Sequence, residues 1–229
     1  MKIKDMYSHN YTYIKPEVPM SAVTKIIEAE LLYRKSQNKD YLKIVYEGVL
    51  SSDYNHELQP EISTLDYYYL DVSEEVDFKY NPETVIKKTS NQEILEDGKR
   101  IDILANKDIM GEEFCIRRIN RKAEVYKDPK ALIDLYVIYY KNEVIGNVEY
   151  LAHGTLIKIE DFDIYEPYQQ KGHGSSLIKF MIDKVRASGA EGIYLITYHD
   201  ATAKYMYEKC GFKFVGQKTE LLFNWNYTT

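Results

Sequence analysis

No part of this sequence restricts the fold more than PYQQKGHGSSLIKF (residues 167–180), which places Gly172 and Gly174 at the start of a predicted helix. The helix is indicated by apolar residues at helical spacing, namely Leu177, Ile178, Met181, Ile182 and Val185. We expect it to end at Gly189, which suits the left-handed position after a helix. The first turn of a helix has N–H groups without intrahelical acceptors, and glycines let an anion approach them. The segment therefore predicts a phosphate-binding loop, with an ordinary tight turn as the alternative.

Charge and hydropathy exclude several classes of partner. The chain has 229 residues and a net charge of −6, whereas a nucleic-acid-binding protein needs a basic face. The longest apolar run, LYVIYY, is too short to span a bilayer. The first ten residues, MKIKDMYSHN, have no apolar core of a secretory signal. We expect a cytoplasmic protein without nucleic-acid or membrane partners, and we leave a homodimer open.

Cysteine and histidine usage predicts neither a disulfide nor a metal site. Cys115 and Cys210 are the only cysteines, and in a long chain without a secretory signal we expect both to be reduced thiols. The five histidines are scattered along the chain, and no pair of cysteines has metal-ligand spacing. We therefore expect no bound metal ion.

Residues 1–82 form an α+β module in our interpretation. Residues 20–37 carry Val23, Ile26, Ile27 and Leu31 on one helical face, with Ser21 as the expected cap. Residues 41–48 and 62–72 are rich in β-formers and predict strands. Residues 44–78 contain nine carboxylates and no Lys or Arg, which favours a solvated acidic surface over an attractor for cationic ligands. We place a boundary in YNPETV (residues 80–85).

Residues 83–229 have a more regular order. Residues 84–90 predict a strand, and Ser90 with Glu93 forms a capping-box pattern before helical sequence that runs to about Tyr126. Residues 132–164 predict three antiparallel strands, with turns at Lys141–Asn142 and at His153–Gly154.

The remaining elements complete a layered fold. GIYLITY (residues 192–198) is apolar on both faces, as in a covered central strand, and a short helix over about 201–210 ends at Gly211. FKFVG and ELLFNW predict two closing strands. The order indicates an α/β (α+β mixed) fold, in which helices flank both faces of a mixed, mostly antiparallel sheet.

The glycine loop matches neither a Walker A loop nor a complete dinucleotide fingerprint. Gln169-x-x-Gly172-x-Gly174 resembles the [QR]-x-x-G-x-[GA] motif of the GNAT superfamily, the acyl-CoA N-acyltransferases. IEDFDIYEPYQQKGHG resembles that family's strand–Pro–Tyr approach, and DATAKYMYEKCGF resembles its N-x-x-A-x-x-x-Y-E-K-x-G-F segment. The resemblance covers about residues 83–227 and implies a GNAT fold with acetyl-CoA as cosubstrate.

The resemblance also implies how each residue of the motif contacts coenzyme A. The backbone of Phe162 and Ile164 would pair with the pantetheine arm, and Gln169 would shape the turn. The pyrophosphate would be held by N–H groups of Gln170, Lys171, Gly172, His173, Gly174 and Ser175. Lys171 would add charge, and the His173 ring is expected to face solvent. Asp200 stands where the family often has Asn, which puts its pantetheine contact in question.

Two residues are implied as catalytic. Tyr207, in YMYEKCGF, matches the family tyrosine that protonates the leaving thiolate, with a packed aromatic ring as the alternative. Glu160, in IEDF, matches the L-E-D-F of polyamine acetyltransferases and would deprotonate the amine, with a solvent-facing strand residue as the alternative. Asp161 and Asp163 would lie on the opposite face of an ideal strand unless a bulge re-aims them.

These observations predict an N-acetyltransferase that transfers an acetyl group to an amine of a small molecule or protein. The alternative is a non-catalytic acyl-CoA-binding or interaction protein that retains the fold. We expect the acceptor to be bound by about residues 91–126 and 214–222. The N-terminal module resembles a partial GNAT unit without a phosphate loop, and an unrelated α+β module is the alternative.

Overall fold

The computed structural model describes residues 10–50 and 54–225, and these form two compact units. The first unit combines the chain up to Tyr67 with Ile196–Ala201 and the chain from Phe214 onward. The second unit combines Tyr68–Leu195 with Thr202–Lys213, so the predicted connection at residues 80–85 lies inside it. The expectation of no secretory signal concerns mainly residues 1–9, which are outside the described ranges. Among the described residues, no helix has the length and apolarity needed to cross a membrane.

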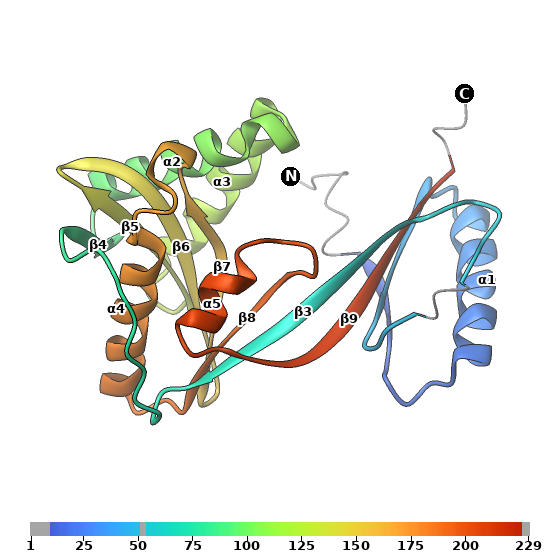
Figure 1. The fold of residues 1–229 in the computed structure, drawn as a ribbon. Helices are drawn as coiled ribbons and strands as arrows, with labels where there is room; N and C mark the ends of the chain where they lie inside the picture. The colour runs from blue at the N-terminus through green and yellow to red at the C-terminus, as the bar shows by residue number, and fades with distance from the viewer. Residues whose placement is uncertain (1–9, 51–53, 226–229) are drawn as a thin grey trace. The chain divides into compact units, whose positions relative to one another are not determined.

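The first unit is a small sheet with one helix (Figure 1). Its strands are β1 (Tyr11–Ile14), β2 (Tyr41–Tyr46), most of β9 (Lys213–Asn224) and the first part of β3 (Glu61–Asp71), in the order β1-β2-β9-β3. The helix α1 (Met20–Ser36) buries Val23, Ile27 and Leu31 of the predicted face, and Ile26 of that face is half-buried. Its N-cap residue is Pro19, without a side-chain cap, so the expected Ser21 cap was wrong: Ser21 lies inside the first turn.

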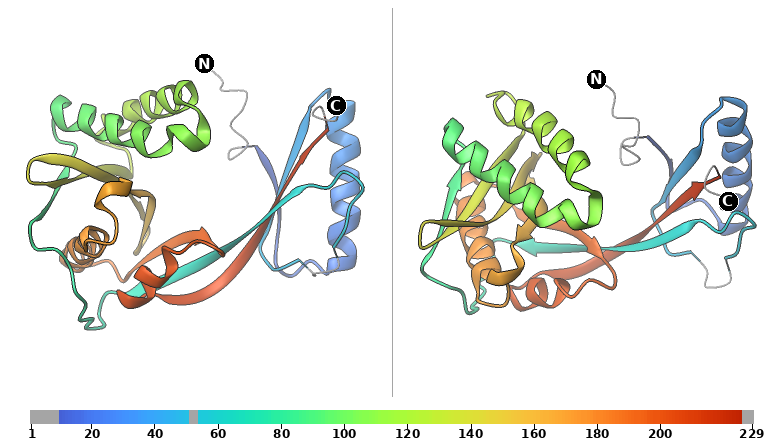
Figure 2. Two further views of the ribbon diagram at one scale, coloured as in Figure 1. Left: turned by 45° about the horizontal axis from the view of Figure 1, so that its top comes forward. Right: turned by 90° about the horizontal axis from the view of Figure 1, so that it is seen from above.

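The second unit is a mixed, mostly antiparallel sheet between helices, which confirms the predicted fold class. Its strand order is β4-β5-β6-β7-β8-β3, with β4 (Thr84–Lys88), β5 (Ile133–Tyr140), β6 (Glu143–His153), β7 (Leu156–Ile164) and β8 (Gly192–Tyr198). β4 to β7 pair antiparallel, and β7 pairs parallel with β8. The helices α2 (Gln92–Met110) and α3 (Glu112–Tyr126) cover one face, and α4 (His173–Ser188) covers the other (Figure 2, left). The short α5 (Lys204–Lys209) follows β8.

Local signals placed most element ends correctly, and the exceptions have local causes. The α2 cap is Asn91, whose side chain accepts from the Ile94 N–H, so the cap lies one residue after the expected Ser90. The turn between β5 and β6 is Lys141–Asn142, and both residues have positive φ, as a tight hairpin turn requires. The two predicted closing strands are one continuous strand, β9, which runs through Gly216.

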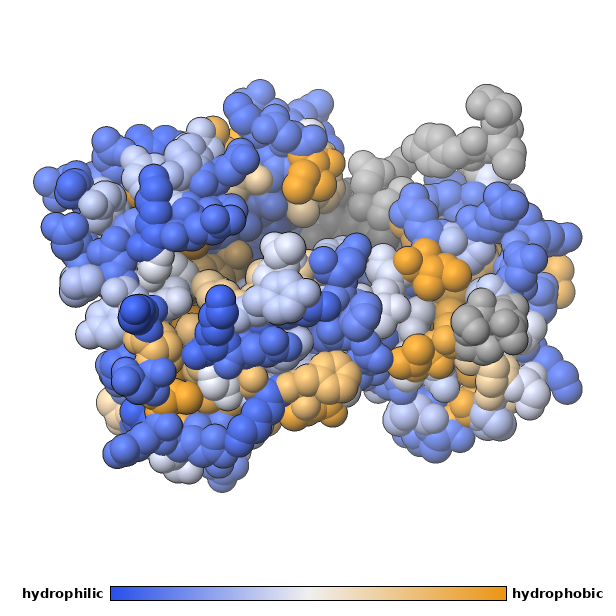
Figure 3. Space-filling view, viewed as in Figure 1, coloured by the Kyte–Doolittle hydropathy of each residue, from blue (hydrophilic) through white to orange (hydrophobic). Residues whose placement is uncertain are grey.

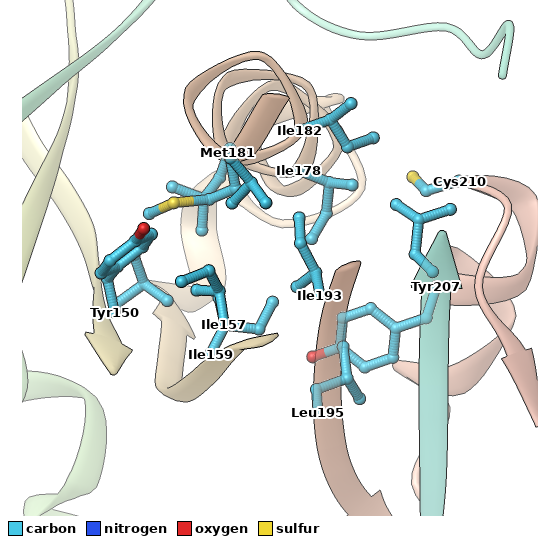
Figure 4. Close-up of a cluster of buried hydrophobic side chains, with 14 of the residues drawn as sticks. Tyr150, Ile157, Ile159, Ile178, Met181, Ile182, Ile193, Leu195, Tyr207 and Cys210 are labelled. Atoms are coloured by element: carbon cyan, nitrogen blue, oxygen red, sulfur yellow. The ribbon is translucent and has the colours of Figure 1, made fainter. Parts of the chain in front are cut away.

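The largest core of the second unit lies between the sheet and α4 (Figure 4). The five apolar residues predicted for the α4 face are all fully buried there, against Ile157 and Ile159 of β7 and Ile193 and Leu195 of β8. Gly189 follows α4 in the left-handed conformation, as expected. Cys115 and Cys210 are both buried and form no disulfide. This packing fixes the axis of α4, and therefore the direction in which its first turn points.

Candidate functional site

An opening between β7 and β8 is the central feature of the second unit. The two strands pair over Leu156–Lys158 and Gly192–Tyr194, and the described pairing ends there. β7 continues to Ile164, paired on its other side with β6. The backbone of residues 159–164 therefore presents an edge that pairs with no described strand on the side opposite β6. Such an edge can bind an extended ligand in the manner of an added strand.

A bulge in β7 re-aims the acidic side chains beside this edge. Glu149 of β6 pairs with Glu160, and Asn147 pairs with Asp163, so two residues of β7, Asp161 and Phe162, lie opposite the single residue Val148. Asp161 has a φ of 42°, which marks the bulge. Gly146 permits it, because a Cβ there would lie 2.2 Å from the Asp163 carbonyl oxygen.

The glycine loop delivers the chain from β7 into the first turn of α4. Gly172 is the N-cap residue of α4 and has a φ of 83°, a conformation that L side chains rarely adopt. The first helical hydrogen bond runs from the Ser176 N–H to the Gly172 carbonyl. The N–H groups of His173, Gly174 and Ser175 precede that bond, and a first turn offers such groups to an anion.

The segment before β4 holds this loop from outside. The Asn81 N–H donates to Ser176 Oγ at 2.9 Å, and Ser176 Oγ donates to the Asn81 carbonyl at 2.7 Å. The Asn81 side chain also donates to the Lys171 carbonyl at 3.2 Å. Sequence reasoning missed this role, because Asn81–Pro82 is typical of any turn. Asn81 is therefore part of the support of the loop.

The polar residues of the loop are engaged within it. Gln169 Nε2 donates to the Ile164 carbonyl at 2.8 Å and so closes the turn. The Ile164 backbone was expected to pair with pantetheine, and its carbonyl already accepts this hydrogen bond. Lys171 Nζ donates to the Pro167 carbonyl at 2.6 Å and lies 5.6 Å from the centre of the Tyr168 ring. Gln170 has a positive φ of 58° at the bend. A phosphate contact by Lys171 would require its ammonium group to leave Pro167.

The expectation that His173 faces solvent was wrong. The residue is 1% exposed, and its ring centroid lies 4.7 Å from that of Tyr140. Its Nδ1 is 2.8 Å from Thr84 Oγ1, while its Nε2 has no hydrogen-bond partner among the described residues. Burial, and then the charge of Lys171, lower the pKa of His173. The His173 ring points into the core from the first turn of α4. Its contact with Thr84 therefore anchors the start of α4 to β4.

Tyr207 is packed beside the opening. It is 7% exposed, and its ring centroid lies 5.9 Å from Phe212, 6.3 Å from Phe162 and 6.5 Å from Tyr68. Figure 4 shows its hydroxyl group directed toward Leu195 and away from Cys210. Burial, followed by the negative charge of Asp163, raises its pKa. The structure thus brings together Tyr207 and Phe162, which the sequence had placed at the same site.

The carboxylates of β7 have different surroundings. Glu160 accepts a hydrogen bond from Lys158 of its own strand. Asp161 Oδ2 accepts from Arg118 at 2.8 Å and from Lys122 at 2.5 Å, both on α3. Asp163 Oδ2 accepts from Asn106 Nδ2 of α2 at 3.0 Å. The bulge therefore turns Asp161 to the α2–α3 face together with Asp163.

The ion pairs continue beneath α2 and α3, whose outer surface is mostly hydrophilic (Figure 3). Arg118 donates to Asp102 at 2.6 Å, and Lys122 donates to Glu149 at 2.7 Å. Burial raises the pKa of Asp102 to about 6, whereas Lys122 and Arg118 lower the pKa of Asp161 despite its burial. Arg118 and Lys122 are four residues apart on α3, a helical spacing that could have indicated a common face.

Two further expectations concern Asp200 and the absence of a metal site. Asp200 lies in the first unit, on the turn after β8, and its predicted pantetheine contact remains a prediction. Among residues 10–50 and 54–225, no group of three or more His, Cys, Asp or Glu side chains could hold a metal ion.

Comparison with known proteins identifies this architecture. The acetyltransferase (GNAT) family matches residues 106–212, which span the opening, the glycine loop and Tyr207. The chain carries a GNAT-family domain. This confirms the resemblance drawn from the loop motif.

The similarity to known proteins extends over most of the chain, beyond the residues that match the GNAT family. An uncharacterised N-acetyltransferase of Bacillus subtilis (strain 168), CgeE, is 25% identical over 225 residues, covering 93% of this chain and 83% of that protein. A functionally unknown conserved protein from Staphylococcus epidermidis ATCC 12228 has a similar fold, with a TM-score of 0.75 at 20% identity over 97% of this chain and 88% of its own. A GCN5-related N-acetyltransferase from Sphaerobacter thermophilus has a TM-score of 0.62 at 12% identity over 90% and 68%.

Proposed function

We propose that this protein is an N-acetyltransferase that transfers the acetyl group of acetyl-CoA to an amine, in the cytoplasm. One observation carries the proposal: the uncovered edge of β7 leads directly into the Gly172 turn and the first turn of α4. A strand edge suits the amide groups of pantetheine, and the helix start suits the pyrophosphate. The relationship to CgeE, named as an N-acetyltransferase, supports the reaction type.

The chemistry requires two proton transfers around one nucleophilic attack. The amine lone pair attacks the acetyl carbonyl carbon, a C–N bond forms, and the C–S bond breaks. The amine gives its proton to a carboxylate, for which Glu160 remains the predicted base. Tyr207 gives its proton to the departing thiolate, so the products are an amide and the free thiol of coenzyme A. Burial of Tyr207 keeps its hydroxyl protonated at neutral pH, as an acid requires.

The test separates binding from turnover. Acetyl-CoA should raise the melting temperature by mass action, equivalent to about 2.7 kcal/mol at one hundred times its Kd. Gly174→Val should weaken this shift, because a branched side chain at the start of α4 would keep an anion away from the backbone, whereas alanine fits the motif. The Met206 sulfur, 2.6 Å from a Cβ at this position, belongs to a flexible side chain that can move. Gly216→Val is the matched control, since a Cβ there would meet nothing within 4 Å.

Turnover is measured as release of coenzyme A thiol with a panel of amines. Release that depends on the amine supports the enzyme. A thermal shift without release from any amine would support the non-catalytic acyl-CoA-binding alternative instead. If neither a shift nor release occurs, or if Gly174→Val retains the full shift, the assignment of the loop is wrong.

A further inference from the structure

We infer that Asp163, flanked by Asn106 and Asn147, binds the ammonium group of the acceptor, so that the acceptor is a primary alkylamine presented in its cationic form. This inference rests on the proposed function and deepens it by naming the acceptor class.

The first support is the geometry around Asp163. Asn147 of β6 is its direct antiparallel partner, and such partners direct their side chains to the same face, about 5 Å apart. Asn106 of α2 donates to Asp163 Oδ2 at 3.0 Å and to the Asp102 backbone carbonyl at 3.0 Å. These two hydrogen bonds hold the Asp163 carboxylate on the side of α2. The site thus combines a negative charge with two oriented amides.

The second support is the local charge balance. Four carboxylates lie on this face, those of Asp102, Glu149, Asp161 and Asp163, against the two cations Arg118 and Lys122. Arg118 and Lys122 donate to Asp102, Glu149 and Asp161, whereas Asp163 accepts from the neutral amide of Asn106. Excess negative charge in a half-buried site is costly unless a cation or a proton neutralises it.

The third support is independent of charge. Asn147 is 1% exposed, yet neither its Nδ2 nor its Oδ1 has a hydrogen-bond partner among the described residues. A buried amide without partners is rare and calls for a missing ligand or water. A primary ammonium group has three N–H donors. One can donate to Asn147 Oδ1 while another donates to the Asp163 carboxylate.

The position also suits the reaction. Phe162 precedes Asp163 in β7, and its ring centroid lies 6.3 Å from that of Tyr207, so the site is on the strand segment that contacts the proposed proton donor. An ammonium group held at Asp163 would begin close to the edge of β7 and to the acid that completes the transfer. One ammonium proton then passes to solvent water, which frees the lone pair for attack, and the proton released on C–N bond formation goes to the predicted base Glu160.

The experiment measures binding without acetyl-CoA. The probe is hexylamine, cationic at pH 7.5, and hexan-1-ol is its neutral counterpart; binding is followed by ligand-observed NMR. Wild-type protein should bind hexylammonium and not hexan-1-ol, and Asp163→Asn should weaken binding by about tenfold or more, since a charge-assisted hydrogen bond is lost. Asp183→Asn, which removes an exposed carboxylate of α4, is the matched control and should bind as wild type. Asn106→Ala, which keeps the charge, should give a smaller loss and serves if Asp163→Asn does not fold.

The outcomes separate this inference from the proposed function. Equal binding by wild type and Asp163→Asn, or loss of binding in Glu160→Gln instead, overturns the inference. Acetylation of amines by a wild-type protein that does not bind hexylammonium overturns the inference and leaves the function standing. Selective binding that depends on Asp163, without release of coenzyme A from any amine, supports the site and refutes the function.

Discussion

Replacing Tyr207 by phenylalanine tests the proton donor directly, because the change removes one oxygen atom and keeps the ring. The ring packs against Phe212, Phe162 and Tyr68 at centroid distances of 5.9, 6.3 and 6.5 Å, and these contacts remain. We therefore expect the melting temperature to change by less than about 2–4 °C, the shift that roughly 1 kcal/mol causes in a domain of this size. The affinity for acetyl-CoA should change little.

The expected loss is in kcat. A positioned general acid contributes roughly 10²–10⁴-fold, and a thiolate already leaves well, so we expect the low end, about 100-fold. That factor corresponds to about 2.7 kcal/mol of transition-state stabilisation. Because burial raises the pKa of Tyr207, its hydroxyl stays protonated from pH 6 to 9, and the ratio of wild-type to mutant kcat should be constant across that range.

The assay is release of coenzyme A thiol under single-turnover conditions, where chemistry limits the rate. Tyr205→Phe is the matched control, because Tyr205 is on the same helix and is 57% exposed. A wild-type rate constant for the chemical step in Tyr207→Phe would remove Tyr207 from the mechanism and leave only its packing role. An equal loss in Tyr205→Phe would show that the effect is not specific to the buried hydroxyl.

Four other perturbations test the structure and the proposed chemistry. Gly172→Ala should lower the melting temperature even without ligand, because a Cβ there would lie 3.0 Å from the Asn81 nitrogen in a left-handed residue; an unchanged melting temperature would contradict the strain. The folded-state pKa of His173 is lowered, so the unfolded chain binds more protons and stability should fall as the pH drops below about 6.5; the melting temperature of His173→Asn should depend less on pH between 7 and 5.5 than that of wild type. Glu160→Gln should depress turnover most at low pH, where fewer amine molecules are neutral. A pH–rate profile of the same shape in wild type and Glu160→Gln would exclude Glu160 as the base. Asn91→Ala should cost about 1 kcal/mol in urea unfolding, because the Ile94 N–H loses its cap; no loss would mean that the end of the helix is fixed by packing alone.

The sequence by itself determined the elements whose signals are local. The apolar spacing after Gly174 was sufficient for α4, because all five predicted residues are buried on one face. The motif from Gln169 to Gly174 was sufficient for the loop, since its turn depends on the conformations available to glycine rather than on distant contacts. Tyr207 and Phe162 were both found through the same resemblance.

Only the tertiary structure decided where the side chains of these elements point. The bulge at Asp161 depends on the register with β6 and on Gly146, so no pattern within β7 could show that Asp161 and Asp163 both point toward α2 and α3. His173 follows the loop rule in its backbone, but the contact of its ring with Thr84 is between residues far apart in the sequence.

The same reason applies to the two units. β9 pairs with β2, residues near opposite ends of the chain, and the apparent break at Gly216 therefore did not end the strand. Strand pairing joins backbone groups of any sequence, so its partners are chosen by burial in the folded chain rather than by a local motif. Local propensity thus determined most elements and the glycine turn before α4, whereas non-local pairing determined which charged side chains surround the opening.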